Sequence, residues 1–183
     1  MFILYAIVIG LALGLVLGGK AHAIGDLHFR WPWLFIAGLA VQVVLFSDAI
    51  TERIGGLGAP IYVVSTALVV AAVLANGRIP GMPIVAIGAG SNLAAIVANG
   101  GYMPASPAAL GALGKAPALV YSNSAVVLQP VLAPLTDIFA LPRWLPWANI
   151  FSIGDLLIGL GVVVVIVAAM RRGRASEPSA GAA

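Results

Sequence analysis

Apolar residues fall into five long blocks that are separated by polar links. The blocks run over residues 2–17, 33–46, 60–75, 83–98 and 153–170. Four of them approach the length that crosses about 30 Å of hydrocarbon at about 1.5 Å per residue, and the second borrows residues 47–50. We therefore expect an all-α fold, a polytopic membrane helix bundle with five transmembrane helices. The expected spans are 2–19, 32–50, 59–75, 83–98 and 152–170.

Two similar segments, each with an Asn-Gly dipeptide followed by prolines, lie at the ends of the fourth block. "LANGRIPGMP" covers residues 74–83, and "VANGGYMPASP" covers residues 97–107. Each follows an expected helix end, where Gly or Asn supplies a left-handed residue and proline prevents continuation. We interpret them as two helix stops rather than as an internal repeat.

Residues 99–151 form a segment too long for a simple connection. Ser106, Pro107 and Gly114 have the order of an N-cap, a first helical residue and a stop, which predicts a two-turn helix. Further on the segment is apolar but broken by prolines, so we expect an extracytoplasmic cap of short helices and turns. A re-entrant hairpin over residues 118–141 is the alternative. Asp137 would cap a turn, pair with Arg143 or face a ligand.

The domain organisation follows from these blocks. We expect a single transmembrane domain over residues 1–172, with the outer cap at 99–151. Residues 173–183, "GRASEPSAGAA", are small and polar and predict a disordered cytoplasmic tail. A cleaved signal peptide ending near "AHA" at 21–23 is the competing interpretation of the first block. It is disfavoured because no positive charge precedes that block.

Composition agrees with a lipid environment. The chain has 183 residues, of which 62% are hydrophobic and only 8% are charged, against about 25% charged in soluble domains. The net charge of +3 does not indicate nucleic acid, because the one basic cluster adjoins an apolar helix and is typical of a membrane anchor. The absence of cysteine excludes disulfides, a thiolate nucleophile and cysteine-ligated iron–sulfur clusters.

The distribution of basic residues predicts the orientation. An N-terminus outside the cell places six basic residues on the cytoplasmic side: Lys20, Arg30, Arg78, Arg171, Arg172 and Arg174. Three remain outside: Arg53, Lys115 and Arg143. This bias follows the positive-inside rule, so we expect the C-terminus in the cytoplasm.

Small residues at a spacing of four predict close helix packing. They form one stripe in the first block and one in the fourth: Gly10, Gly14 and Gly18, and Ala86, Gly90 and Ala94. We expect the stripes to pack against another helix of the chain, plausibly against each other, or against a second protomer. A close-approach site for a flat ligand is the rarer alternative. Gln42 and Asn92 are sparse polar residues inside the blocks, and we expect this amide pair to hydrogen-bond between helices, with contact to a small polar substrate as the alternative.

The outer face carries the candidate ligand site. The residues expected to line it are Asn99, Tyr102, Asn149, Ser152 and Asp155, at the rim of an apolar recess. Ser152 and Asp155 also have the spacing of a capping box, which is the structural alternative. His22 and His28 lie in a polar link outside the apolar blocks, so we expect no metal site and no haem or other cofactor.

Several motifs resemble an uncharacterised bacterial integral membrane family known as a domain of unknown function. The resemblance covers the glycine-rich first helix, "GDLHFRW", "NGRIPG", "NIFSIGD" and "ANGGYMPASP", of which the last, with the form ANGGxMPxSP, is the most specific. It implies a small multi-pass protein of the bacterial cytoplasmic (inner) membrane, and it implies no activity, cofactor or catalytic residue.

The most consistent function is that of a noncatalytic subunit or scaffold of a membrane complex. Its expected partners are membrane lipid and other membrane protein subunits, or a second copy of the chain, and not nucleic acid. The alternative is a carrier or receptor that binds a small apolar or amphipathic molecule, such as a lipid or quinone, under the outer cap. An enzyme ranks third, because no HExxH, nucleophile or phosphate-loop motif occurs.

Overall fold

The computed structural model describes residues 2–114, 124–125, 127 and 129–175. Its helices are α1 (Phe2–Val16), η1 (Ala21–Asp26), α2 (Pro32–Leu45), α3 (Asp48–Thr51), η2 (Gly55–Leu57), α4 (Gly58–Ala75), α5 (Met82–Ala98), α6 (Pro107–Leu113), η3 (Ala133–Leu135) and α7 (Ile153–Ala175). Its strands are β1 (Met103–Pro104), β2 (Ser124–Ala125), β3 (Phe139–Ala140) and β4 (Ile150–Phe151). The chain is therefore mostly helical, as the apolar blocks predict.

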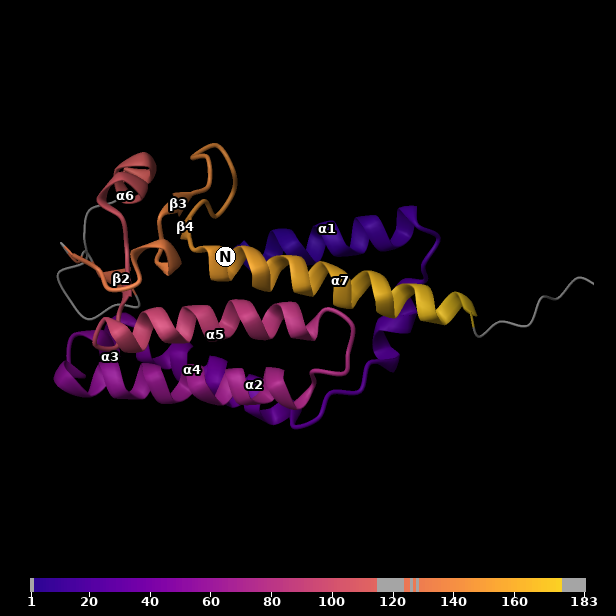
Figure 1. Ribbon diagram of the computed structural model, residues 1–183, viewed down its shortest axis with the longest axis horizontal. Helices are drawn as coiled ribbons and strands as arrows, with labels where there is room; N and C mark the ends of the chain where they lie inside the picture. The colour runs from indigo at the N-terminus through magenta and orange to yellow at the C-terminus, as the bar shows by residue number, and fades with distance from the viewer. Residues whose placement is uncertain (1, 115–123, 126, 128, 176–183) are drawn as a thin grey trace, which may run out of the picture.

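The long helices lie side by side along the longest axis of the molecule (Figure 1). Their contacts give the order α2, α4, α5, α7, α1 across the row. By length and composition, two stretches of the described part are long and apolar enough to cross a membrane, Gly55–Ala75 and Ile153–Arg172. Helices α1, α2 and α5 are apolar but shorter.

Two expected boundaries are wrong. Helix α2 ends at Leu45 instead of continuing to residue 50, because Ser47 adopts an extended backbone and starts the separate helix α3. Helix α7 continues to Ala175, so the first three residues of the expected tail, 173–175, are helical. Basic side chains near a helix C-terminus favour such an extension. The remainder of the expected tail, 176–183, lies outside the described residues.

The outer cap gathers at one end of the row and corrects the all-α expectation. Strand β1 pairs with β2 in parallel, and β3 pairs with β4 antiparallel. A bridge between Ala105 and Asp137 adds to the cap. The predicted two-turn helix is confirmed as α6, which ends at Gly114 with a φ of 66°. The expected alternatives of a surface cap or a re-entrant hairpin over residues 118–141 concern in part residues 118–123, 126 and 128, which lie outside the described residues.

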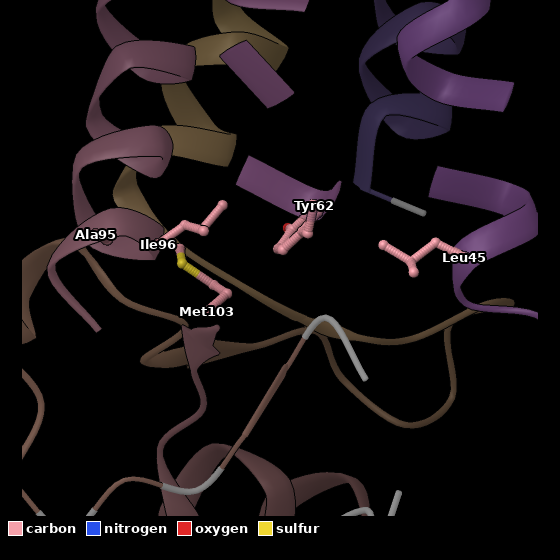
Figure 2. Packing of buried hydrophobic residues seen from close by; sticks show 5 residues of the cluster. All are labelled: Leu45, Tyr62, Ala95, Ile96 and Met103. Carbon is pink, nitrogen blue, oxygen red and sulfur yellow. The ribbon is translucent and has the colours of Figure 1, made fainter. Parts of the chain in front are cut away.

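A buried apolar cluster joins the cap to the row of helices. Leu45 of α2, Tyr62 of α4 and Ile96 of α5 meet Met103 of β1 there (Figure 2). The Met103 side chain points from the cap toward Ile96 (Figure 2). The cap therefore shares a hydrophobic core with the ends of three long helices.

The small residues Gly10 and Gly14 of α1 pack against another helix as expected, but that helix is α7 and not α5. A Cβ atom at Gly10 would lie 3.1 Å from the Cβ of Ile166, and one at Gly14 would meet the end of Met170. Gly18 is outside α1 and has a φ of 75°, since it terminates the helix. That conformation places Gly18 at the helix end instead of in the packing stripe.

Only one residue of the small stripe expected on α5 is packed inside the chain: Ala86 lies against a buried cluster that includes Val73 of α4 and Val165 of α7. A Cβ at Gly90 would meet no atom within 4 Å, and Ala94 is exposed. The contact with α7 instead uses glycines seven residues apart. Gly88 lies against the Gly154 backbone, and Gly161 lies against Gly81. Without side chains at these four positions, the two helix backbones approach closely over two turns.

Candidate functional site

Three polar side chains meet where α7 begins. Asn92 on α5 donates from Nδ2 to Asp155 Oδ1 over 2.8 Å, and it accepts at Oδ1 from the Ser152 hydroxyl over 2.8 Å. Ser152 and Asp155 also bond reciprocally, because each backbone N–H donates to the other side chain, over 3.1 and 2.9 Å. We call this group the polar cluster. Its capping box confirms one of the two interpretations drawn from the S-x-x-D spacing.

Glycine packing brings the cluster together. A Cβ at Gly154 would overlap the amide oxygen of Asn92 and lie 2.7 Å from the Gly88 carbonyl oxygen. A side chain at position 154 would therefore occupy the space in which the Asn92 amide bonds to α7. The close approach of the helices and the polar cluster depend on each other.

The bonding pattern makes the cluster a structural connection instead of a reactive group. Ser152 is fully buried, its hydroxyl proton points to an amide oxygen, and its oxygen accepts the Asp155 N–H. An amide oxygen does not serve as a general base, so Ser152 lacks the partner that a nucleophile needs. Asp155 accepts from two N–H donors at the N-terminus of α7, where the helix dipole favours a negative charge.

The asparagines of the two Asn-Gly segments form similar hydrogen bonds at the ends of α4 and α5. At the end of α4, Asn76 Nδ2 donates to Ala72 O over 2.7 Å and to Arg30 O over 2.8 Å, and Arg30 N donates to Asn76 Oδ1 over 2.7 Å. At the end of α5, Asn99 bonds in the same way to its own helix and to a distant residue. It donates to Ala95 O and Val131 O, each over 2.8 Å, and accepts from Val131 N over 2.9 Å.

Each asparagine thus fixes a distant piece of backbone to the end of its helix. We call these pairs the Arg30 clamp and the Val131 clamp. Both asparagines have negative φ angles, −106° and −109°, so neither is the left-handed residue expected from Gly or Asn at each helix end. Gly100 and Gly101 supply positive φ at the second site, 73° and 90°. The two Asn-Gly segments share a side-chain function more than a turn conformation.

The structure brings together only part of the expected ligand site. Ser152 and Asp155 belong to the polar cluster, whereas Asn99 holds Val131 in the cap. Tyr102 packs at the edge of the apolar cluster around Tyr62. Asn149 precedes β4, and its Oδ1 is buried without a hydrogen-bond partner. Within the described part of the chain, no group of three or more His, Asp or Glu residues could hold a metal ion.

A model of a family of unknown function, DUF5317, matches residues 26–167, which is most of the chain. The chain belongs to this family. No curated protein and no solved structure matches it. The DUF5317 match includes the polar cluster and both clamps, and it excludes α1 and the last residues of α7.

Sequence reasoning about this DUF5317 chain missed the partner of Asn92. Both amides hydrogen-bond between helices as expected, but not to each other: Gln42 Nε2 donates to Thr66 Oγ1 of α4 over 3.2 Å, and Asn92 bonds to α7. Helices α2 and α5 carry apolar residues around their whole circumference, so the sequence does not show which face of α5 packs against the rest of the chain. The repeated Asn-Gly dipeptide did carry a signal for the clamps, since an asparagine at a helix end can bond backbone beyond the helix.

Proposed function

We propose that this chain is a five-span integral membrane protein that serves as a noncatalytic subunit or scaffold of a membrane complex. Helices α1, α2, α4, α5 and α7 would be the spans, with the outer cap at the extracytoplasmic face. The location proposed is a bacterial cytoplasmic membrane. Support comes separately for the membrane, the orientation and the scaffold role.

Exposed apolar side chains support the membrane assignment. In a single row every long helix keeps an uncovered flank, and those flanks carry large apolar residues. Val16 is 82% exposed, Val43 is 73% exposed and Ile36 is 70% exposed. Soluble monomers rarely expose contiguous apolar patches of such extent, whereas lipid covers them without cost.

Helix length is compatible with this assignment if the bilayer adapts. Helices α1 and α2 have 15 and 14 residues, which correspond to roughly 22 and 21 Å of rise. A hydrocarbon core of about 30 Å would thin locally, or the residues flanking each helix would complete the span. Trp31 and Trp33 at the start of α2 are exposed, as interfacial anchors are.

Charge at the two ends of the row supports the orientation. Five basic residues of the described part adjoin helix ends that lie opposite the outer cap (Figure 1): Lys20 follows α1, Arg30 precedes α2, Arg78 lies between α4 and α5, and Arg171 and Arg172 are near the end of α7. At the outer cap end, Arg53 lies between α3 and η2, and Arg143 lies between β3 and β4. Because basic residues remain in the cytoplasm, this difference favours an outer cap outside the cell and a cytoplasmic C-terminus.

One observation carries the scaffold role: the polar side chains that suggest a site are occupied by structural hydrogen bonds. Asn92, Ser152 and Asp155 bond one another, and Asn99 bonds the cap backbone. They stabilise the arrangement of helices and cap and leave the exposed helix flanks as the surface for partners. In the described part of the chain an added Cβ at Gly90 meets no atom within 4 Å and Ala94 is exposed, so both allow close approach by a partner helix or a second copy.

Native mass measurement after gentle extraction from membranes tests the proposal. We expect a complex with another membrane protein or a second copy, and we expect Gly90→Leu to dissociate it. Ala67→Leu, on an exposed face of α4, is the matched control and keeps the complex. A monomer without any protein partner would contradict the scaffold role.

A carrier for a small apolar or amphipathic molecule is the second candidate. The buried Oδ1 of Asn149 favours it, because an unpaired acceptor is costly and a ligand donor would satisfy it. In that case the extracted protein carries a stoichiometric lipid or quinone instead of a protein partner. Asn149→Leu would then release the molecule, whereas the scaffold proposal predicts that assembly is unchanged.

A further inference from the structure

An apolar groove runs along the contact between α1 and α7, toward the end of the row opposite the outer cap. Its volume is about 560 Å³. It is lined by Leu13, Leu17, Val163, Val164, Val167 and Ala168, with Arg171 and Arg172 at its end. We call it the α1–α7 groove. It is distinct from the polar cluster, which lies at the other end of α7.

Glycine packing and one backbone bond fix the two walls. Gly14 lets α1 approach Met170 of α7 on the buried side, and Lys20 N donates to Met170 O over 2.9 Å. On the open side the groove is lined by larger apolar side chains of both helices. Leu13 and Leu17 are 43% and 48% exposed there. The groove therefore opens sideways, in the direction from which membrane lipid would enter.

The groove has the length of one acyl chain in one leaflet. From Val163 to Arg172, α7 rises by about 13 Å, while half of the hydrocarbon core measures about 15 Å. The apolar lining stops where Arg171 and Arg172 begin. Both arginines are exposed, so their guanidinium groups stand at the depth expected of lipid headgroups.

The positive charge at the end of the groove favours an anionic lipid headgroup. The lining contains two arginines and no acidic residue. Guanidinium groups bind phosphate oxygens with paired, charge-assisted hydrogen bonds. Basic pockets between membrane helices on the cytoplasmic side fit anionic lipid headgroups for this reason. A soluble anion would use the arginines but not the apolar walls.

We propose that the α1–α7 groove binds one anionic phospholipid. One acyl chain lies between α1 and α7, and the headgroup phosphate lies against Arg171 and Arg172. This inference rests on α1 and α7 lying in a membrane, as proposed above, and not on the scaffold role. Such a lipid would cover the part of the α1–α7 contact that the chain leaves open.

Lipid competition on the full chain tests the proposal. The purified protein is mixed with equal amounts of phosphatidylglycerol and phosphatidylcholine that share the same acyl chains, and retained lipid is counted by native mass spectrometry. We expect about a 30-fold preference for phosphatidylglycerol, which corresponds to about 1 kcal/mol for each of two basic side chains. Arg171→Gln should reduce the preference about fivefold, and the double variant with Arg172→Gln should abolish it.

Two further variants separate the groove from general charge attraction. Arg78→Gln removes an exposed arginine from the same end of the molecule, outside the groove, and should leave the preference unchanged. Ala168→Phe fills the groove and should reduce binding of both lipids, and Leu17→Trp repeats the test on the opposite wall. Equal retention of the two lipids by the unmodified protein would overturn the proposal.

Two further outcomes would contradict the lipid proposal. If Arg78→Gln weakens the preference as much as Arg171→Gln does, the arginines act as a diffuse surface charge and the proposal is wrong. If neither groove-filling variant changes lipid retention while melting temperatures are unchanged, the acyl chain lies elsewhere and the proposal is wrong. These measurements use isolated protein, so they fail independently of a test of membrane orientation in cells.

Discussion

Adding one methyl group at Gly88 should separate α5 from α7. The new Cβ would lie 2.5 Å from Gly154 O and 2.9 Å from Ile158 N, and both are backbone atoms. Ordinary contact begins at 3.4 Å, so the first distance is 0.9 Å short and the helices must move apart. A shift of that size would stretch the 2.8 Å bond from Asn92 to Asp155 beyond hydrogen-bonding range.

The expected cost of Gly88→Ala follows from these contacts. Overpacking costs about 1–3 kcal/mol, and loss of a hydrogen bond adds about 1 kcal/mol. The better helix propensity of alanine offsets up to about 1 kcal/mol. We therefore expect a net destabilisation of about 2 kcal/mol, or a melting temperature lower by about 4–8 °C for a chain of this size.

Gly90→Ala is the matched control, because it adds the same atom to the same helix in open space. It should leave stability unchanged or raise it by up to about 1 kcal/mol. Gly14→Ala should fall between the two, since the new Cβ meets the flexible end of Met170. Unfolding in mixed micelles with increasing SDS, followed by circular dichroism, measures all three variants. A Gly88→Ala protein as stable as Gly90→Ala would refute the packing argument.

Two further predictions concern the polar cluster and the clamps. Asn92→Asp or Asp155→Asn alone should destabilise the protein by about 1–3 kcal/mol, because two carboxylates or two amides then face each other. The double exchange again pairs an amide donor with a carboxylate acceptor and should recover part of this loss, whereas additive losses would show that the two side chains do not interact. Asn99→Ala should speed hydrogen exchange of the Val131 amide and leave the Arg30 amide unchanged, since the two clamps are separate; equal acceleration at both amides would contradict separate clamps.

Local signals in the sequence predicted individual elements well. The apolar blocks gave the positions of the long helices, and Ser106, Pro107 and Gly114 gave α6. The spacing of Ser152 and Asp155 gave the capping box. These features depend on residues within one or two turns of each other, so neighbouring sequence is sufficient to predict them.

Contacts between helices were predicted poorly, and the reason is physical. In an apolar helix every face is suited to lipid or to protein, so the pattern does not identify the packed side. A spacing of four favoured Gly90, whereas the observed contact uses Gly81 and Gly88, seven residues apart. The partner of Asn92 is Asp155, 63 residues away, and no local rule connects them.

Thiol labelling in intact cells tests the five-span orientation most directly. The chain has no cysteine, so single cysteines need no altered background. Gly56, Gly111 and Gly25 are exposed with no atom within 4 Å of an added Cβ, so they tolerate substitution. A membrane-impermeant maleimide should label Gly56→Cys and Gly111→Cys in intact cells, and Gly25→Cys only after permeabilisation. Labelling of Gly25→Cys in intact cells, or protection of Gly56→Cys, would contradict the account.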